Sequence, residues 1–207
     1  APLAHIDARA RLDFGPFGSV RLTDSETGIG DVSVNPVTIY GGDGPLYWSL
    51  AEHVTAPTGR FRADRIASPG RNHWSFDTVA ALSWIDWAAG YEIAAAAGVI
   101  ANTRNRATDY RTGAEAHLDA SFNMLLAPDI AVGATLYGLA ALERDRGAGA
   151  GTDPPKPQAL GAGLQAIWTP DPADFAPSIR VKWLHDISAR DRLKGDAVFL
   201  IVEAPLN

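Results

Sequence analysis

Three side chains near position 120 have the types that a hydrolase uses for nucleophilic catalysis: Ser121, His117 and Asp119. Such a triad needs a base that is hydrogen-bonded to the nucleophile. The three residues alternate with Leu118 and Ala120, so they share one face of a strand, on which residues i and i+4 lie about 13 Å apart. The sequence also contains no Gly-x-Ser-x-Gly motif. We therefore predict that the chain is not an enzyme and that His117 is a hydrogen-bonding group in an interior.

Other familiar site chemistries are also missing from the 207 residues. The absence of cysteine excludes a disulfide scaffold, a thiolate metal site and a cysteine nucleophile. No His-Glu-x-x-His or calcium-loop motif is present, and the glycine-rich segment Gly147–Gly151 lacks the lysine of a phosphate-binding loop. A net charge of −6 argues against binding to nucleic acid through its phosphates. We expect no metal, no cofactor and no nucleic-acid partner.

The ionisable residues follow a period of two, which is the period of a β-strand. The first example is the segment 5–14, in which His5, Asp7, Arg9, Arg11 and Asp13 alternate with purely apolar residues. The same alternation recurs along the chain and predicts ten strands, at about 5–14, 31–35, 46–55, 75–84, 91–102, 117–124, 130–137, 160–168, 178–186 and 197–203.

Two kinds of β-structure have strands with one apolar and one polar face. In a soluble barrel or sandwich the apolar face packs densely inside, and in a membrane barrel it faces lipid. The apolar faces here are rich in alanine, as in Ala94–Ala97, which would underfill a soluble core. The polar faces carry ions of both signs, which can pair across a lumen. We therefore predict an all-β fold, an up-and-down antiparallel transmembrane β-barrel of ten strands that forms a single domain over residues 1–207, with a soluble β-fold as the alternative.

The connections between the ten predicted strands alternate strictly in length. Long ones cover about 15–30, 56–73, 103–115 and 143–157, and short ones include 41–44, 88–90 and 127–129. In an up-and-down sheet this alternation gives one rim of long loops and one of tight turns, as in outer-membrane barrels. An even number of strands would place both ends of the barrel on the short-turn rim.

The polar faces supply the candidate pore-lining residues, and the long loops supply candidates for an outer vestibule or constriction. The predicted lumen residues are Asp7, Arg9, Arg11, Asp13, Asp31, His53, Asp77, Glu92, His117, Asp119, Arg180 and Lys182. The predicted loop residues are Arg60, Arg62, Arg71, Asn72, Trp74, Arg104, Asp109, Tyr110 and Arg111, although solvated loop charge is the simpler interpretation of these. Beside the short turns we expect an aromatic girdle of Tyr47, Trp48, Trp84, Trp87, Tyr91 and Trp168.

Several loop segments carry a more specific signal. They are Gly28–Val32, Ala56–Phe61, Gly70–Phe76, Asn102–Asn105, Ala107–Gly113, His117–Asp119 and Asp191–Val198. In this order, from about Gly28 to Leu206, the sequence resembles the outer-membrane proteins named for the meta-pathway of phenol degradation, also called the SphQ-like transporters. Members of that family are typically longer at the N-terminus, so twelve strands are as compatible with the resemblance as ten.

The resemblance implies a channel in the outer membrane of a Gram-negative bacterium that admits small hydrophobic or aromatic compounds. The lipid bilayer and such solutes are then the expected partners. Small barrels usually have interiors filled by side chains. The alternative function is therefore a structural or interaction barrel with a sealed lumen, whose long loops bind a partner.

Overall fold

The computed structural model describes residues 3–13, 15, 18–171, 176–192 and 194–204. This part of the chain consists of antiparallel strands and one short 3-10 helix, and none of its helices is long and apolar enough to cross a bilayer. The strands are β1 (Leu3–Asp13), β2 (Ser19–Ile29), β3 (Val32–Asp43), β4 (Leu46–Ala56), β5 (Ser75–Asp86), β6 (Tyr91–Asn102), β7 (Glu115–Ala127), β8 (Ile130–Ala141), β9 (Gln158–Trp168), β10 (Ser178–Arg190) and β11 (Asp196–Glu203), and the helix is η2 (Ala148–Ala150).

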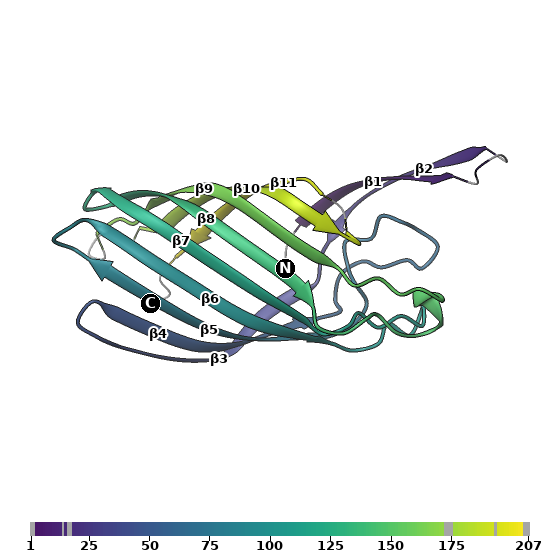
Figure 1. Cartoon of the computed structure of the whole chain (residues 1–207), viewed down its shortest axis with the longest axis horizontal. Helices are drawn as coiled ribbons and strands as arrows, with labels where there is room; N and C mark the ends of the chain where they lie inside the picture. The colour runs from purple at the N-terminus through teal and green to yellow at the C-terminus, as the bar shows by residue number, and fades with distance from the viewer. Residues whose placement is uncertain (1–2, 14, 16–17, 172–175, 193, 205–207) are drawn as a thin grey trace.

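Strands β3 to β11 form one up-and-down sheet in which each strand pairs with its neighbours in the sequence (Figure 1). The alternating pattern predicted these nine strands. The prediction of a long loop over 15–30 is wrong, because most of that segment is β2. It pairs with β1 in a separate hairpin, from Leu3 opposite Ile29 to Asp13 opposite Ser19.

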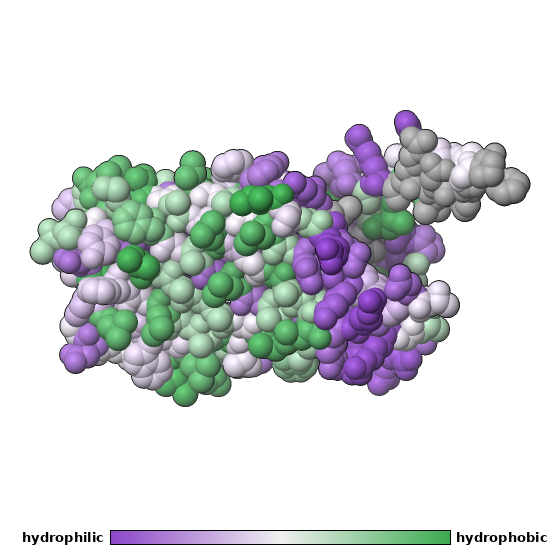
Figure 2. All heavy atoms as spheres, viewed as in Figure 1, coloured by the Kyte–Doolittle hydropathy of each residue, from purple (hydrophilic) through white to green (hydrophobic). Residues whose placement is uncertain are grey.

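The sheet is apolar outside and polar inside. Exposure alternates along β5 and β6, where Phe76, Leu82, Trp84 and Ile93 are exposed on the outer face. Among the described residues, only four alanines are buried apolar residues, whereas nine buried residues are polar or charged. Figure 2 shows apolar and small residues over the visible outer face of the sheet and hydrophilic residues gathered at its long-loop end. This distribution is the reverse of the one in a soluble domain.

The predicted alternation of connections holds within the nine-stranded sheet. Tight turns join β3 to β4 and β5 to β6, where Gly44 and Gly90 take the left-handed conformation (φ 57° and 72°) that glycine adopts without a steric penalty. Longer segments at the opposite rim join β4 to β5, β6 to β7 and β8 to β9 (Figure 1).

Strands β3 and β11 are the two edges of the sheet, and no ladder joins them within the described residues. The antiparallel all-β prediction is therefore confirmed, whereas closure into a barrel is not. Because the sheet has nine strands, β3 begins at the long-loop rim and β11 ends at the short-turn rim. The expectation that both ends of the barrel lie on the short-turn rim is wrong for this sheet, because β1 and β2 do not belong to it.

Candidate functional site

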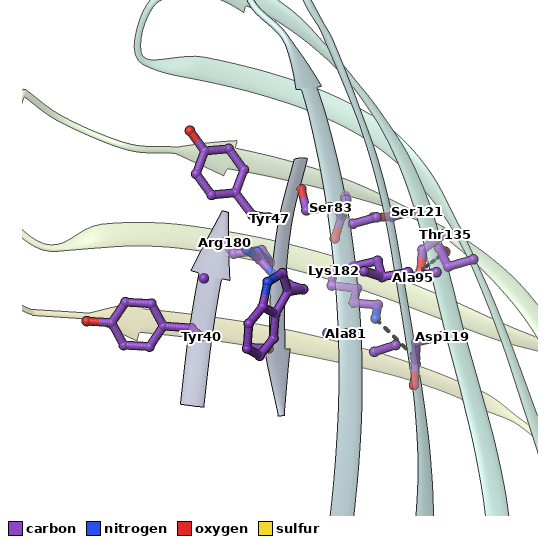
Figure 3. Close-up of a pocket in the computed structure, with 18 residues that line it drawn as sticks. Tyr40, Tyr47, Ala81, Ser83, Ala95, Asp119, Ser121, Thr135, Arg180 and Lys182 are labelled. Carbon is purple, nitrogen blue, oxygen red and sulfur yellow. Dashed lines mark hydrogen bonds and ion pairs between the residues drawn. The ribbon is translucent and has the colours of Figure 1, made fainter. Parts of the chain in front are cut away.

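The inner face of the sheet surrounds an open hollow of about 400 Å³ (Figure 3). Arg180 and Lys182 of β10 lie on one side of it, and Tyr40 of β3 and Tyr47 of β4 lie on another. Strands β4 and β10 are far apart in the order of the sheet, so a shared hollow means that the sheet is strongly curved. Between these sides the wall consists of small side chains of β4 to β8: Ser49, Ala81, Ser83, Ala94, Ala96, Ser121 and Thr135.

Seven of the predicted lumen residues lie on the inner face of the nine-stranded sheet. They are His53, Asp77, Glu92, His117, Asp119, Arg180 and Lys182. Their arrangement along this face agrees with the predicted strand parity, and their role as pore-lining residues remains a prediction. The hydrolase-like trio does not assemble, because the ring nitrogens of His117 face Asp77 and Asp119.

The Asp77–His117 pair depends on a glycine. Asp77 of β5 and His117 of β7 lie on either side of β6, and His117 Nε2 is 3.0 Å from Asp77 Oδ1. Gly98 of β6 is opposite His117 in the register, and Asp77 is opposite Ile100, two residues further along β6, so the pair crosses β6 diagonally over Gly98. A methyl group at Gly98 would overlap the imidazole and come within 2.9 Å of the carboxylate. The missing side chain therefore allows the two polar groups to meet over the middle strand.

The same arrangement occurs twice more on the inner face. Gln165 of β9 donates to Asn123 Oδ1 of β7 at 2.7 Å, across Gly133 of β8. The Tyr137 hydroxyl of β8 donates to Asp186 of β10 across Gly161 of β9. We call these three sets glycine bridges. The sequence analysis did not identify the role of these glycines. A glycine flanked by polar residues on the same face of both neighbouring strands is the signal that could have identified it.

A further network lies nearer the short-turn rim. Glu92 accepts hydrogen bonds from Ser83 at 2.8 Å and from Asn123 at 3.0 Å. Through Asn123 it joins the bridge over Gly133, so polar contacts run from β5 to β9. These contacts satisfy the buried amide and carboxylate groups within the protein, as low-dielectric surroundings require.

The two cations of β10 that line the hollow, Arg180 and Lys182, are less well satisfied. Lys182 Nζ lies 3.9 Å from Asp119 Oδ1, which is the outer limit for an ion pair. Arg180 forms no ion pair with any described residue, and its Nε is buried without a hydrogen-bond acceptor. The hollow thus contains a guanidinium group with unused hydrogen-bonding capacity.

Five predicted lumen residues lie away from this inner face. Asp7, Arg9, Arg11 and Asp13 belong to β1, which among the described residues pairs only with β2. The side chains of Arg11 and Asp13 lie outside the part of the chain that the structure describes. Asp31 lies in the turn between β2 and β3, where its carboxylate accepts from the backbone N–H groups of Gly59 and Arg71, each at 2.8 Å. These five were predicted to line the lumen because alternation reveals the face of a strand but not the sheet to which the strand belongs.

Arg65, which the sequence analysis did not select, attaches the β1–β2 hairpin to the long-loop rim. Its guanidinium group forms ion pairs with Asp24 and Glu26 of β2, the latter at 2.5 Å. The backbone N–H groups of Ile66 and Ala67 also donate to Asp24. The Arg65 hydrogen bond, together with these backbone donors, lowers the pKa of Asp24 from its usual 3.8 to about 2. We call this set the Arg65 clamp.

The predicted loop residues mostly bind to other parts of the loops. Arg60 pairs with Glu26 at 2.8 Å and Arg62 with Asp64 at 3.1 Å. Arg104 pairs with Asp109, whose φ of 50° is left-handed, and Asp109 also accepts from the N–H of Ala148. Of these contacts, the Arg60–Glu26 pair joins a long loop to β2 and the Asp109–Ala148 hydrogen bond joins two long loops, whereas the other two pairs each lie within one loop.

A buried centre connects two of these loops. Asp145 accepts from the N–H of Gly113 at 2.8 Å and from the Tyr110 hydroxyl. Burial of the phenol, followed by its bond to Asp145, raises the pKa of Tyr110 well above its usual 10. Arg111 donates from Nε to the carbonyl oxygen of Asn102 at 3.0 Å, which ties the loop to the end of β6.

The segment that leads into β5 contains three of the predicted loop residues, Arg71, Asn72 and Trp74. The Asn72 amide donates to Asn105 Oδ1 at 2.9 Å, and the Asn105 amide donates to the Arg71 carbonyl oxygen at 3.1 Å. Trp74 stacks on Phe76, with ring centroids 6.5 Å apart. Since Phe76 lies on the outer face, Trp74 belongs to the outer surface near the rim rather than to a vestibule.

The fold resembles that of a known class of membrane protein. The crystal structure of the COG4313 outer membrane channel from Pseudomonas putida F1 superposes with a TM-score of 0.68 at 14% sequence identity. The alignment covers 85% of this chain and 65% of that one, so this chain spans just under two thirds of its solved relative. Residues 1–201 match the family described as "Putative MetA-pathway of phenol degradation", and the chain belongs to this family. The resemblance inferred from the loop segments is thereby confirmed. No curated protein sequence matches the chain significantly.

Proposed function

We propose that this chain is an outer-membrane channel whose curved sheet closes into a single-domain barrel and admits small hydrophobic or aromatic compounds. The observation that carries the proposal is the inverted distribution of polarity, in which apolar side chains face outward and polar side chains are buried within. Lipid solvates such an outer face, whereas water does not. The family and the solved channel of the same fold support the location and the function. A channel of this kind performs no chemistry on its solutes.

The aromatic side chains support the bilayer placement. Trp84, Trp87 and Trp168 are exposed near the short-turn rim, and Tyr91 stacks on the outer-face residue Phe122 at a centroid distance of 6.0 Å. Trp74 is exposed at the opposite rim, and Trp183, which is exposed near the middle of β10, donates a hydrogen bond to Asp196 at the long-loop end of β11. Two such belts bound the apolar band of an outer-membrane barrel, which is about 25 Å tall. Tyr47 of the predicted girdle lines the inner hollow instead.

Two measurements test the proposal. The purified chain should partition into detergent and run on a gel as a heat-modifiable β-sheet species, with faster migration before boiling. Vesicles containing it should take up toluene or phenol faster than empty vesicles. A water-soluble monomer without detergent, or uptake equal to that of empty vesicles, would contradict the proposal.

A sealed structural barrel is the second candidate, and the glycine bridges favour it because they fill part of the inner face with hydrogen-bonded side chains. The two candidates differ in what the loops do. If the channel function is right, replacing the loop 142–157 with a short turn leaves uptake intact or faster. If the loops bind a partner, the replacement abolishes partner binding while uptake is absent in both proteins.

A further inference from the structure

We propose that the hollow on the inner face binds an aromatic carboxylate, with its carboxylate on Arg180 and Lys182 and its ring against Tyr40 and Tyr47. This inference rests on the proposed channel function and narrows its solute class to aromatic acids of the benzoate type. These four residues come from β3, β4 and β10 and line the same hollow; in the view of Figure 3 the rings of Tyr40 and Tyr47 lie on the opposite side of Arg180 from Lys182.

The first argument is charge. The acidic and basic side chains that line the hollow are Arg180, Lys182 and Asp119, so the lining has a formal excess of one positive charge. Asp119 compensates Lys182 only at 3.9 Å, and Arg180 has no ion-pair partner among the described residues. A partly desolvated cation without a counter-ion is costly, so the site favours an anion.

The second argument is hydrogen bonding. Arg180 Nε is buried and has no acceptor. A guanidinium group offers parallel N–H donors that match the two oxygens of a carboxylate. A neutral phenol or hydrocarbon supplies no charge and leaves the guanidinium group uncompensated. The carboxylate therefore accounts for a feature of the site that a purely apolar solute does not.

The third argument is the shape and polarity of the part of the hollow that lies away from Arg180 and Lys182. Tyr40 and Tyr47 supply aromatic surface, and much of the lining between them and the cations is small, as at Ala81, Ala94 and Ala96, with Trp48 and Leu82 as further apolar lining residues. Larger residues at the alanine positions would fill the space. The volume of about 400 Å³ falls within the range of about 300–1,000 Å³ that is usual for small-molecule sites. A planar ring fits these surroundings better than a hydrated inorganic anion does.

The experiment is a calorimetric titration of the detergent-solubilised full chain with benzoate, and with phenol and toluene as neutral probes, at pH 7. We expect benzoate to bind most tightly. Arg180→Gln should weaken benzoate binding by about ten-fold or more, because a charge-assisted hydrogen-bonded pair is lost. Binding of toluene should change little. Arg180→Lys should retain part of the benzoate affinity, and Tyr40→Ala should weaken benzoate more than acetate.

Arg144→Gln is the matched control, because Arg144 is an exposed loop arginine whose side chain, among the described residues, pairs with Asp153 and the Pro154 carbonyl oxygen. It should leave benzoate binding unchanged. Heat-modifiable migration shows that each variant is folded. Equal benzoate affinity of the unaltered chain and Arg180→Gln overturns the inference, as does binding of toluene or phenol without binding of benzoate. In the latter case the proposed channel function stands, whereas failure to partition into detergent or to take up any solute removes that function itself.

Discussion

At the scale of single residues, the glycine bridges show how small residues on one strand determine contacts between its two neighbours. Gly98, Gly133 and Gly161 each lie between polar side chains that hydrogen-bond over the middle strand. A side chain at any of them would separate its pair and leave partly buried polar groups without partners. Such groups cost more to leave unpaired than the hydrogen bond itself contributes.

The first prediction concerns Gly98. Gly98→Ala places a methyl group where it overlaps His117 and lies 2.9 Å from Asp77 Oδ1. Overpacking and loss of the pair should lower the free energy of unfolding by about 1–3 kcal/mol. Gly138→Ala is the control, because the nearest atom to its methyl group is the Ala159 carbonyl oxygen at 4.0 Å. Urea unfolding of the two variants in detergent measures the difference, and equal stabilities would show that the bridge does not contribute.

The second prediction is the pH dependence of the Arg65 clamp. The pKa of Asp24 in the folded protein is about 2, below its usual 3.8. A lowered pKa means that the carboxylate contributes fully above about pH 4 and that its contribution is lost as the pH falls toward 2. Glu26 and Asp64 also face Arg65, and the pKa of Asp64 is lowered in the same direction, chiefly by Arg62.

Hydrogen exchange of the β2 amides, corrected for the intrinsic effect of pH on exchange, measures how strongly the Arg65 clamp protects β2. Protection should be constant from pH 7 to about 4 and should decrease between pH 4 and 2. Asp24→Asn should give low protection throughout, with a weaker dependence on pH in that window. Asp153→Asn is the control, because Asp153 is an exposed loop carboxylate that pairs with Arg144 and lies far from β2 in the sequence. Protection that is unchanged in Asp24→Asn would contradict the clamp.

At the scale of the strands, alternation in the sequence was sufficient to predict a strand where every second residue is apolar. Strands β5 to β9 were found because each keeps this pattern over most of its length. Strand β2 was missed because its apolar parity changes: Val20 and Leu22 are followed on the same face by Asp24 and Glu26, which bind Arg65. A local contact with a loop thus replaces the periodic signal, and no single-strand pattern can reveal it.

The contacts between inner-face residues also could not be predicted from the sequence. Asp77 and His117 were both selected as lumen residues, but their contact depends on the register of three strands. A shift of one residue would turn one of them outward. Alternation determines the face of each residue, and only the ladder hydrogen bonds determine its neighbours.

The third prediction tests the assignment of faces with two adjacent alanines of β6. Ala97 is exposed on the outer face, and Ala96 lines the inner hollow opposite Asp119 in the register. Ala97→Lys should lower stability in vesicles by about 2–4 kcal/mol if the residue lies near the bilayer midplane. Ala96→Lys should cost less, because its ammonium group can reach Asp119. Equal costs, or a larger cost for Ala96→Lys, would mean that the apolar face does not contact lipid.

At the scale of the whole molecule, the two edges of the sheet need partners for their backbone hydrogen-bonding groups. Strands β3 and β11 each lack a neighbour on one side within the described residues. In a bilayer every unpaired backbone N–H or carbonyl group costs several kcal/mol, so an open sheet cannot persist there. Both edge strands run from the long-loop rim to the short-turn rim, so their direct pairing would be parallel, whereas one intervening strand would make every pair antiparallel.

The fourth prediction is that both edges are closed within one chain in the membrane. In vesicles, the amides of β3 and β11 should be as protected from exchange as those of the central strands β6 and β7, because all of them are paired. The β1–β2 hairpin lies outside the nine-stranded sheet and provides an internal comparison, since its outer amides should exchange faster. The mass of the protein–detergent particle separates the two ways of covering the edges: one chain per particle indicates closure within a monomer, and two indicate closure between copies. Fast exchange confined to β3 and β11 would show that the edges stay open, and the proposal of a membrane-spanning barrel would then fail.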